Sequence, residues 1–335
     1  MDPATEKAIY DTVFEATSRV ISPFFAVLRS DELLYWPFLL SAFVLALVGF
    51  AIARGSLGRG FLGDFRRTYF STAVWWHPSA RADYRFYIVN GILFPLIFGP
   101  VLLSGFWVSG QVAALLNGWF GSSGGGGAGI GAILLYSVLF FLLYDFGRYL
   151  GHYVQHRFDL LWQFHKVHHS AEVLTPISNA RAHPVDLLCM WTFPHAFTGL
   201  LQGVFAYLYA EAITPVSYLG LHVAIFAYNL FGNLRHSHVW LSYGPVVSRL
   251  LISPAMHQIH HSTEERHFGR NIGYALSLWD WLFGTLYVPR GHEHFELGLG
   301  DGSEARYRGV WRMYWLPLVD IAAQYRRRLT VSERP

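Results

Sequence analysis

The sequence predicts an all-α integral-membrane protein, in which four to five hydrophobic helices carry a cytoplasmic, helical, histidine-rich cap. Three observations lead to this prediction. The chain is 53% hydrophobic and only 14% charged, uncharged apolar stretches recur along it, and ten of its 17 histidines fall in four short clusters. A helix of about 20 apolar residues crosses a hydrocarbon core of about 30 Å. The apolar composition and these stretches therefore predict a protein that lies in a membrane.

Five apolar stretches are candidates for these helices. The first is uninterrupted, whereas Pro95 and Pro100 break the second, and Glu211 and Pro215 separate the last two. The later stretches fit either full spans or a shallow hairpin that re-enters the same side of the membrane. The five stretches cover residues 36–53, 86–108, 130–144, 187–209 and 216–231.

The loops between the stretches predict the topology. Arginines crowd residues 54–85, whereas the glycine-rich loop at 122–129 carries no charge. Because basic loops remain in the cytoplasm, the first loop is expected inside and the second outside. The third stretch then delivers His152 to the cytoplasm, where the basic residues 326–328 also place the C-terminus. The charged first thirty residues do not predict a cleavable signal peptide.

One histidine spacing, His-x-x-His-His, occurs twice, and residues three and four apart share a face of a helix. Ten clustered imidazoles are too many for one metal ion and suit two. His236 and His238 would splay by about 200° on an ideal helix, so one of the two is either a ligand or a residue that orients one. The ten candidate ligands are His152, His156, His165, His168, His169, His236, His238, His257, His260 and His261.

The remaining histidines have other expected roles. His183 lies in a proline-flanked turn and is either a ligand or a residue that orients one. His222 is expected in core packing, because a helix would place it about 21 Å from His236. The isolated histidines are expected in the core or on the surface; they are His77, His195, His267, His292 and His294.

The residue types in and around the clusters indicate which metals and which classes of reaction the site suits. Imidazoles around two ions suit iron, zinc or copper, but zinc hydrolases use an acidic general base, and no carboxylate lies between the clustered histidines. An apolar, aromatic chain favours an oxygen-activating site that admits a C–H bond, although zinc stays open. A metal-binding protein without catalysis and a zinc-dependent membrane hydrolase are the alternatives. The single Cys189 excludes an internal disulfide and iron–sulfur ligation by this chain, and nothing suggests nucleic acid.

The clusters and their flanking residues resemble the fatty acid hydroxylase and sterol desaturase superfamily over about residues 130–290. The resemblance implies an oxygen-dependent di-iron membrane enzyme with a lipid substrate, cytoplasmic histidine boxes and either hydroxylation or desaturation as its reaction. It carries over as ligands the histidines of the first, second and last boxes; the third box, at 233–238, varies in the family. The matching motifs are His152-x-x-x-His156-Arg157, Trp162-Gln-Phe-His165-Lys-Val-His168-His169-Ser170, His257-Gln-Ile-His260-His261, Asn271-Ile-Gly273 and Trp279-Asp280-Trp-Leu-Phe-Gly284-Thr285.

The same resemblance implies the cofactor and the partners. Two iron ions are expected, with zinc as the alternative in the isolated protein. No His-Pro-Gly-Gly haem motif occurs, so electrons are expected from a separate donor, a reductase, a ferredoxin or a cytochrome b5-like protein. The chain divides into a lead (1–35), two membrane helices with their loops (36–129), the hydroxylase-like domain (130–290) and a C-terminal segment (291–335). In the last segment, residues 310–319 predict an interfacial helix with aromatic residues.

Overall fold

The computed structural model describes residues 21–55, 57–99, 102–123, 125–209 and 213–332, with the side chains of 329–332 left aside. These residues are mostly helical, as predicted. The longer helices are α2 (Trp36–Arg54), α5 (Pro78–Ile97), α6 (Gly105–Phe120), α7 (Ile130–Arg157), α8 (Asp159–His169), α9 (Pro184–Leu208), α10 (Val223–Gly232) and α14 (Val310–Ser332). The shorter elements are η1 (Ser22–Leu28), α3 (Phe61–Tyr69), α4 (Thr72–Trp75), η3 (Pro176–Ala180), α11 (Gly244–Val247), α12 (Pro254–His260), η4 (Glu265–His267), α13 (Leu278–Leu282) and η5 (Glu304–Tyr307). Of the lead predicted over 1–35, residues 1–20 lie outside this described part.

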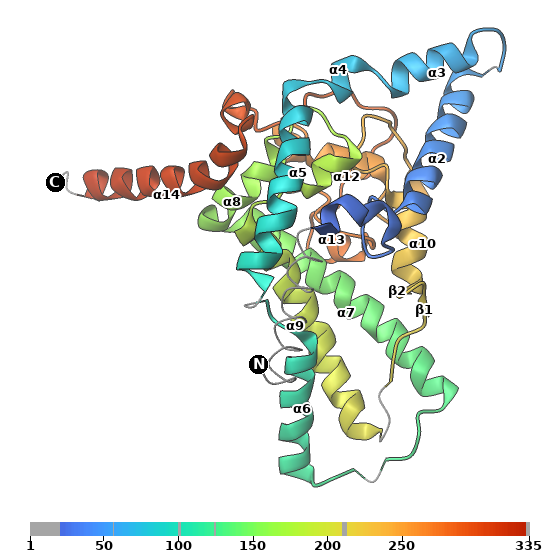
Figure 1. Ribbon diagram of the computed structural model, residues 1–335, viewed down its shortest axis with the longest axis vertical. Coiled ribbons are helices and arrows are strands. Elements are labelled where there is room, and N and C mark those ends of the chain that lie inside the picture. The colour runs from blue at the N-terminus through green and yellow to red at the C-terminus, as the bar shows by residue number, and fades with distance from the viewer. Residues whose placement is uncertain (1–20, 56, 100–101, 124, 210–212, 333–335) are drawn as a thin grey trace, which may run out of the picture.

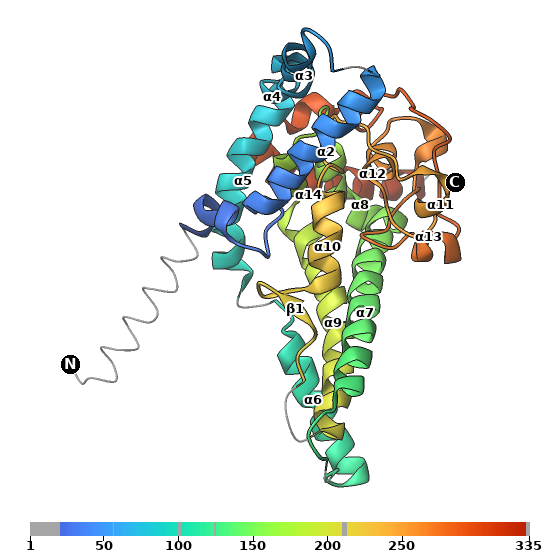
Figure 2. The same ribbon diagram turned by 90° about the vertical axis from the view of Figure 1, so that its right-hand side faces the viewer.

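Helices α6, α7 and α9 pack side by side into a narrow stem that leads down from a broader body (Figure 1, Figure 2). Glycines let the backbones approach. A Cβ atom added at Gly147 of α7 would lie 2.5 Å from Pro194 Cα of α9, and one at Gly203 of α9 would lie 2.5 Å from Val112 Cβ of α6. Close packing through small residues is the usual way in which helices associate inside a membrane.

Two helices of the described chain, α2 and α7, are long and apolar enough to cross a membrane. Only 17% of the apolar window of α2 is buried inside the protein. Its exposed side chains recur at every fourth residue and form an outward apolar stripe, which soluble proteins rarely expose. The stripe consists of Trp36, Leu40, Val44, Val48 and Ile52.

Two of the five predicted stretches, 86–108 and 216–231, do not form continuous helices. The stretch at 86–108 is divided, since α5 ends at Ile97 and α6 begins only at Gly105. Pro95 already occupies the last turn of α5, and Pro100 disfavours helical backbone at the residue before it. The stretch at 216–231 starts with the antiparallel strands β1 (Ser217–Tyr218) and β2 (Leu221–His222).

The turn between these strands explains the second correction. Leu219 and Gly220 adopt φ values of 50° and 80°, which reverse the chain before α10 begins. The ten residues of α10 extend only about 15 Å, too short for a span. The stem therefore contains α6, α7 and α9, while α10 packs against α2 beside the body. The predicted stalk of four to five helices is not confirmed.

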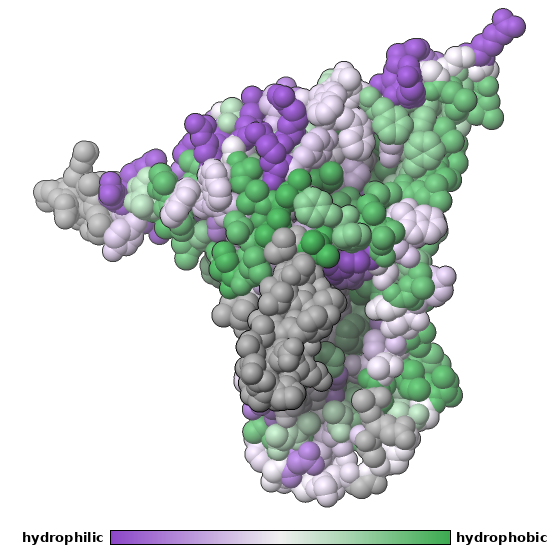
Figure 3. All heavy atoms as spheres, in the orientation of Figure 1, coloured by the Kyte–Doolittle hydropathy of each residue, from purple (hydrophilic) through white to green (hydrophobic). Residues whose placement is uncertain are grey.

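Helix α14 projects from the body, nearly across the direction of the stem (Figure 1). It is longer than the predicted helix at 310–319 and exposes Trp311, Trp315, Leu318 and Val319. In Figure 3, hydrophilic residues gather along the upper edge of the molecule, whereas hydrophobic residues cover α2 and the underside of the body near α14. This distribution suits a surface that meets a membrane on one side and water on the other.

Candidate metal centre

Nine of the ten predicted ligands gather into two groups at the upper end of α7. Within each group the candidate ligand atoms all lie within 4.8 Å of one another. The first histidine group consists of His152, His156, His165, His169 and His260. The second histidine group consists of His168, His236, His257 and His261. All except the half-buried His156 are buried, so the two groups form one interior site.

Each His-x-x-His-His motif contributes to both groups. In α8, His165 and His169 are one helical turn apart and enter the first group, whereas His168 points to the second. In α12 and its C-cap, His257 and His261 are one turn apart and enter the second group, whereas His260 points to the first. The four-residue spacing thus places two rings on one ion site, and the third ring, rotated by about 100°, reaches the other.

Hydrogen bonds fix the ring orientation of three histidines in the first group. His152 Nδ1 donates to the Ile272 carbonyl over 2.7 Å, and His260 Nδ1 donates to the Arg270 carbonyl over 2.8 Å. His165 Nδ1 donates to Asp186 Oδ2 over 3.1 Å. A neutral imidazole carries one proton, so Nε2 of each ring presents a lone pair.

These Nε2 atoms point at one another. His152 Nε2 lies 3.0 Å from His165 Nε2 and 3.1 Å from His260 Nε2. Since the ring protons are used at Nδ1, no hydrogen bond relieves the repulsion of the facing lone pairs, whereas a metal cation between them would. His169 Nε2 is also buried without a hydrogen-bond partner. The donor set and its geometry therefore fit a metal ion.

In the second histidine group the Nε2 atoms also lie close together. His168 Nδ1 donates to the Arg181 carbonyl over 3.1 Å, and His168 Nε2 lies 3.3 Å from His236 Nε2. His257 Nε2 lies 3.0 Å from His236 Nε2 and 3.3 Å from His261 Nε2. Burial lowers the pKa of His168 to about 4 and that of His260 to about 3. Both rings are therefore neutral at pH 7, the form that binds metals.

Two buried carboxylates hold the loop that orients His152. Asp280 accepts hydrogen bonds from Ile272 N over 2.8 Å, from Gly273 N over 2.9 Å and from the Thr285 hydroxyl over 2.6 Å. Burial raises the pKa of Asp280 to about 6. A Cβ at Gly273 would lie 2.6 Å from Asp280 Oδ2, so only glycine lets the carboxylate approach. This contact explains why the sequence carries Asn-Ile-Gly and Trp-Asp near the histidines.

The second carboxylate, Asp145, comes from α7. Its oxygens accept hydrogen bonds from Ala275 N over 2.9 Å, Leu276 N over 3.1 Å and Trp279 Nε1 over 2.9 Å. The helix that delivers His152 is thereby fastened to the loop whose carbonyl orients the same ring. Such supporting contacts commonly change metal affinity about 10–100-fold when they are removed.

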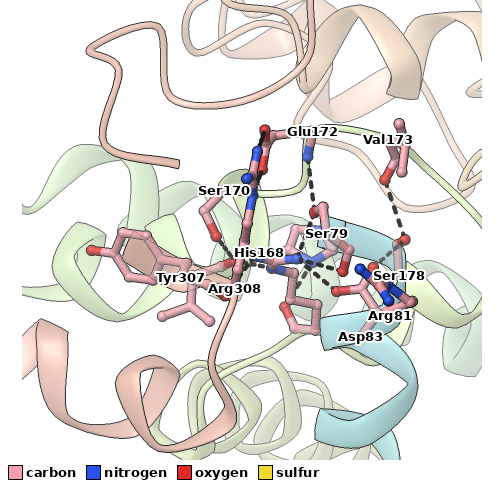
Figure 4. A network of polar contacts seen from close by, with 12 residues as sticks. Ser79, Arg81, Asp83, His168, Ser170, Glu172, Val173, Ser178, Tyr307 and Arg308 are labelled. Atoms are coloured by element: carbon pink, nitrogen blue, oxygen red, sulfur yellow. Dashed lines mark hydrogen bonds and ion pairs between the residues drawn. The ribbon is translucent and has the colours of Figure 1, made fainter. Parts of the chain in front are cut away.

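The second histidine group is fastened by Arg181, which is fully buried. Its guanidinium forms a 2.7 Å ion pair with Asp83 of α5 and donates to the carbonyls of Val167 and Tyr307. Figure 4 shows the surrounding contacts, in which the Ser178 hydroxyl donates to Asp83 and His168 lies close by. The network joins α5, α8 and the C-terminal segment behind His168, so removal of one partner leaves a buried charge.

The structure places the other predicted histidines outside both groups. His238 Nε2 donates to the Thr68 carbonyl over 3.1 Å, away from its expected position as a ligand. His183 caps α9 by accepting a hydrogen bond from Val185 N and donates to the Tyr314 carbonyl. His222 is buried, as expected for core packing, and donates to the Ser137 carbonyl.

A cavity of about 180 Å³ opens onto both histidine groups. Besides five of the histidines it is lined by Arg148, Arg235, Tyr274, Leu187 and Met190. Sequence reasoning missed Arg148, Arg235 and the orienting Asp186, because each lies outside the histidine motifs and reaches the site only through the fold. The signal that was present is the pair Asp145 and Arg148, charges at the end of an otherwise apolar helix.

Two adjacent groups of buried imidazoles at the end of an apolar helix define a membrane-associated protein with a candidate centre for two metal ions. Residues 137–285 match the family described as fatty acid hydroxylase. Over these residues the chain is similar to that family, which supports the resemblance to the fatty acid hydroxylase and sterol desaturase superfamily that the motifs indicated. The matched residues lie within the domain predicted over 130–290.

Several curated proteins are similar to this chain. The ornithine lipid hydroxylase OlsE of Rhizobium tropici is 30% identical over 162 residues, 48% of this chain and 45% of the relative. Human alkylglycerol monooxygenase is 27% identical over 43% of this chain and 29% of its own length. The Delta(7)-sterol-C5(6)-desaturase of Nicotiana tabacum is 25% identical over 47% of this chain and 51% of its own length. The chain thus spans about half the length of these relatives or less, and no solved structure matches it.

Proposed function

We propose that this protein is a membrane-bound di-iron oxygenase that hydroxylates an unactivated C–H bond of a lipid, using O2 and electrons from a separate donor. One observation carries the proposal: two groups of buried histidines, with no carboxylate in either group, line one cavity. The alternative reaction is desaturation of a lipid at the same site. The similar proteins include both a lipid hydroxylase and a sterol desaturase.

In this proposal each histidine group holds one iron ion. Bound iron supplies the reduction of dioxygen and the oxidation of the C–H bond. The family favours iron over zinc, although neutral imidazoles bind both. His238 is not included among the proposed ligands, and neither is His183, since both use their ring nitrogens in other hydrogen bonds.

The chain's own residues position the ligands and exclude water. The carbonyls of Ile272 and Arg270 accept from Nδ1 of His152 and His260, which directs Nε2 inward. Burial keeps His168 and His260 neutral. Neither histidine group contains a carboxylate that could serve as the acidic general base of a zinc hydrolase, so the zinc hydrolase is not favoured.

We further propose the topology predicted from the arginines, with the site and the C-terminus in the cytoplasm. In Figure 1, α3, which follows the arginine-bearing end of α2, and the glycine-rich loop after α6 lie at opposite ends of the molecule, which suits this orientation. A reporter fused after Arg328 is expected to be active in the cytoplasm, and one inserted at Gly125 outside. The reverse pattern would overturn the topology.

Isotope labelling tests the reaction. The purified protein, loaded with ferrous iron and supplied with a reductase, should consume oxygen only when a lipid is added. Hydroxylation predicts that one atom of labelled O2 enters the product, whereas desaturation predicts oxygen uptake without label. Product that forms without O2, with its label from water, would refute the oxygenase. His77→Ala, a substitution outside both histidine groups, is the matched control for His260→Ala.

A further inference from the structure

We propose that the cavity beside the histidine groups contains an anion subsite, in which Arg148 and Arg235 bind the oxyanion of a lipid headgroup. The inference rests on the proposed function and deepens it, because it names the chemical class of the substrate. The shared chemistry is an oxyanion, either a carboxylate or a phosphate, attached to an apolar chain.

The two cations converge on one aromatic ring. The Arg148 guanidinium carbon lies 4.9 Å from the centroid of Tyr274, and that of Arg235 lies 4.5 Å from the same centroid. Both arginines and Tyr274 line the cavity. Arg235 comes directly before His236, and Arg148 lies one helical turn before His152, so the subsite adjoins both histidine groups.

Neither cation has a carboxylate partner in the part of the chain that the structure describes. Arg235 donates to the Tyr228 hydroxyl, the Tyr274 carbonyl and Asn229 Oδ1, all neutral acceptors. Arg148 donates to the Met190 carbonyl over 3.4 Å, and its Nε is buried without a hydrogen-bond partner. Asp145 lies one turn before Arg148 on α7, but both of its oxygens already accept hydrogen bonds from the 275–279 segment.

A buried cation without a counter-ion favours the binding of an anion in this cavity. Arg235 is 4% exposed, and a buried cation without a counter-ion is costly. With the histidines neutral, the two guanidinium groups outnumber Asp186, a carboxylate that also lines the cavity and accepts a hydrogen bond from His165. The net charge of these side chains is therefore positive, and metal ions would increase it. Guanidinium groups bind carboxylates and phosphates through paired hydrogen bonds, so an oxyanion is the group that this cavity accepts.

The volumes of two neighbouring cavities indicate where the headgroup and the tail of the lipid would lie. A cavity of about 180 Å³ is smaller than the ~300–1,000 Å³ of pockets that enclose a drug-sized ligand. A second cavity of about 540 Å³ shares Asn179 and Leu187 with it. Its lining includes the apolar Phe94, Leu102 and Trp191, and also Arg29 and Glu32, which form an ion pair with each other. The headgroup therefore occupies the smaller cavity, while the apolar tail leaves through the larger one. As a consequence, the oxidised carbon lies a few bonds from the headgroup rather than at the far end of the tail.

Binding of three lipids with the same tail tests the subsite. The probes are hexadecanoate, hexadecyl phosphate and hexadecanol, bound to iron-loaded full-length protein in detergent. The wild type should bind at least one anion more tightly than the alcohol. Arg148→Gln and Arg235→Gln should each weaken anion binding about tenfold or more, as for a charged hydrogen bond, and leave the alcohol unchanged. Arg249→Gln, at an exposed arginine away from the cavity, is the matched control.

The outcomes of this experiment distinguish a failure of the anion subsite from a failure of the proposed function. Preference for only one anion identifies the headgroup and supports the subsite. Equal binding of all three probes, or a preference that survives both arginine variants, overturns it. If Arg235→Gln loses its iron or fails to fold, Arg235→Lys and Arg148→Gln decide, since a structural role would weaken alcohol and anion alike. A wild type that binds anions but no metal would contradict the proposed function and leave the subsite standing.

Discussion

Replacement of Asp280 by asparagine is the sharpest test of how the loop supports the site. The change keeps the shape of the side chain but turns one acceptor oxygen into a donor amide. Asp280 Oδ1 accepts from Ile272 N and the Thr285 hydroxyl, whereas Oδ2 accepts from Gly273 N alone over 2.9 Å. The amide oxygen can keep the first pair, so the amide nitrogen must then face the N–H of Gly273, donor against donor.

The expected magnitude follows from this geometry. One buried N–H without an acceptor costs about 1–3 kcal/mol, and the loop can relieve it only by moving Gly273. Movement of Gly273 shifts the neighbouring Ile272 carbonyl, which holds His152 Nδ1 at 2.7 Å. Loss of such an orienting contact typically weakens metal binding about 10–100-fold. Asp280→Asn should therefore lower both the free energy of unfolding and the iron affinity.

Two assays on the same samples check this prediction. Chemical unfolding in detergent gives the stability, and competition with a chelator gives the iron affinity. Asp159→Asn is the matched control, because its side chain is 77% exposed and pairs only with Arg328 in the described chain. An Asp280→Asn variant that matches Asp159→Asn in both assays would refute the proposed link between the loop and the centre.

Three further predictions concern the two histidine groups and the helices of the stem. His260→Ala should lower the iron content measured by mass spectrometry, whereas His238→Ala should leave it unchanged; equal losses would contradict the grouping. Metal-free protein should lose stability in unfolding assays as the pH falls from 6.5 to about 4, since the unfolded state binds the proton that folded His168 excludes; a flat profile would contradict that. Gly203→Ala should destabilise the stem by about 1–3 kcal/mol through overlap with Val112, seen as a lower midpoint in thermal unfolding; an unchanged midpoint would contradict the packing.

The histidine centre was the most predictable part of the molecule. Spacings of three and four place side chains on one helix face wherever the helix lies, so His165 could be expected beside both His168 and His169 from sequence alone. What spacing could not show is which ion each ring serves. His168 and His260 cross to the opposite group because α8 and α12 face each other, a long-range relation that no local pattern encodes.

The failures have local physical causes. The apolar stretch at 216–231 hides a chain reversal at Leu219 and Gly220, and hydropathy alone does not detect a turn made of an apolar residue and a glycine. His238 was assigned by its proximity to His236 in the sequence, but residues two apart diverge, and its ring instead donates to the Thr68 carbonyl. Arg148 and Arg235 meet only through Tyr274, which the sequence separates from both.

Metal content, resolved group by group, tests the central claim most directly. Protein reconstituted anaerobically with ferrous iron should hold about two ions per chain, one for each set of converging imidazoles. Replacement of His156 and His169 by alanine should remove one ion and leave the other, and replacement of His236 and His261 should do the same for the second group. Wild-type protein with a single ion, or both double variants with unchanged iron content, would contradict a centre built from two histidine groups.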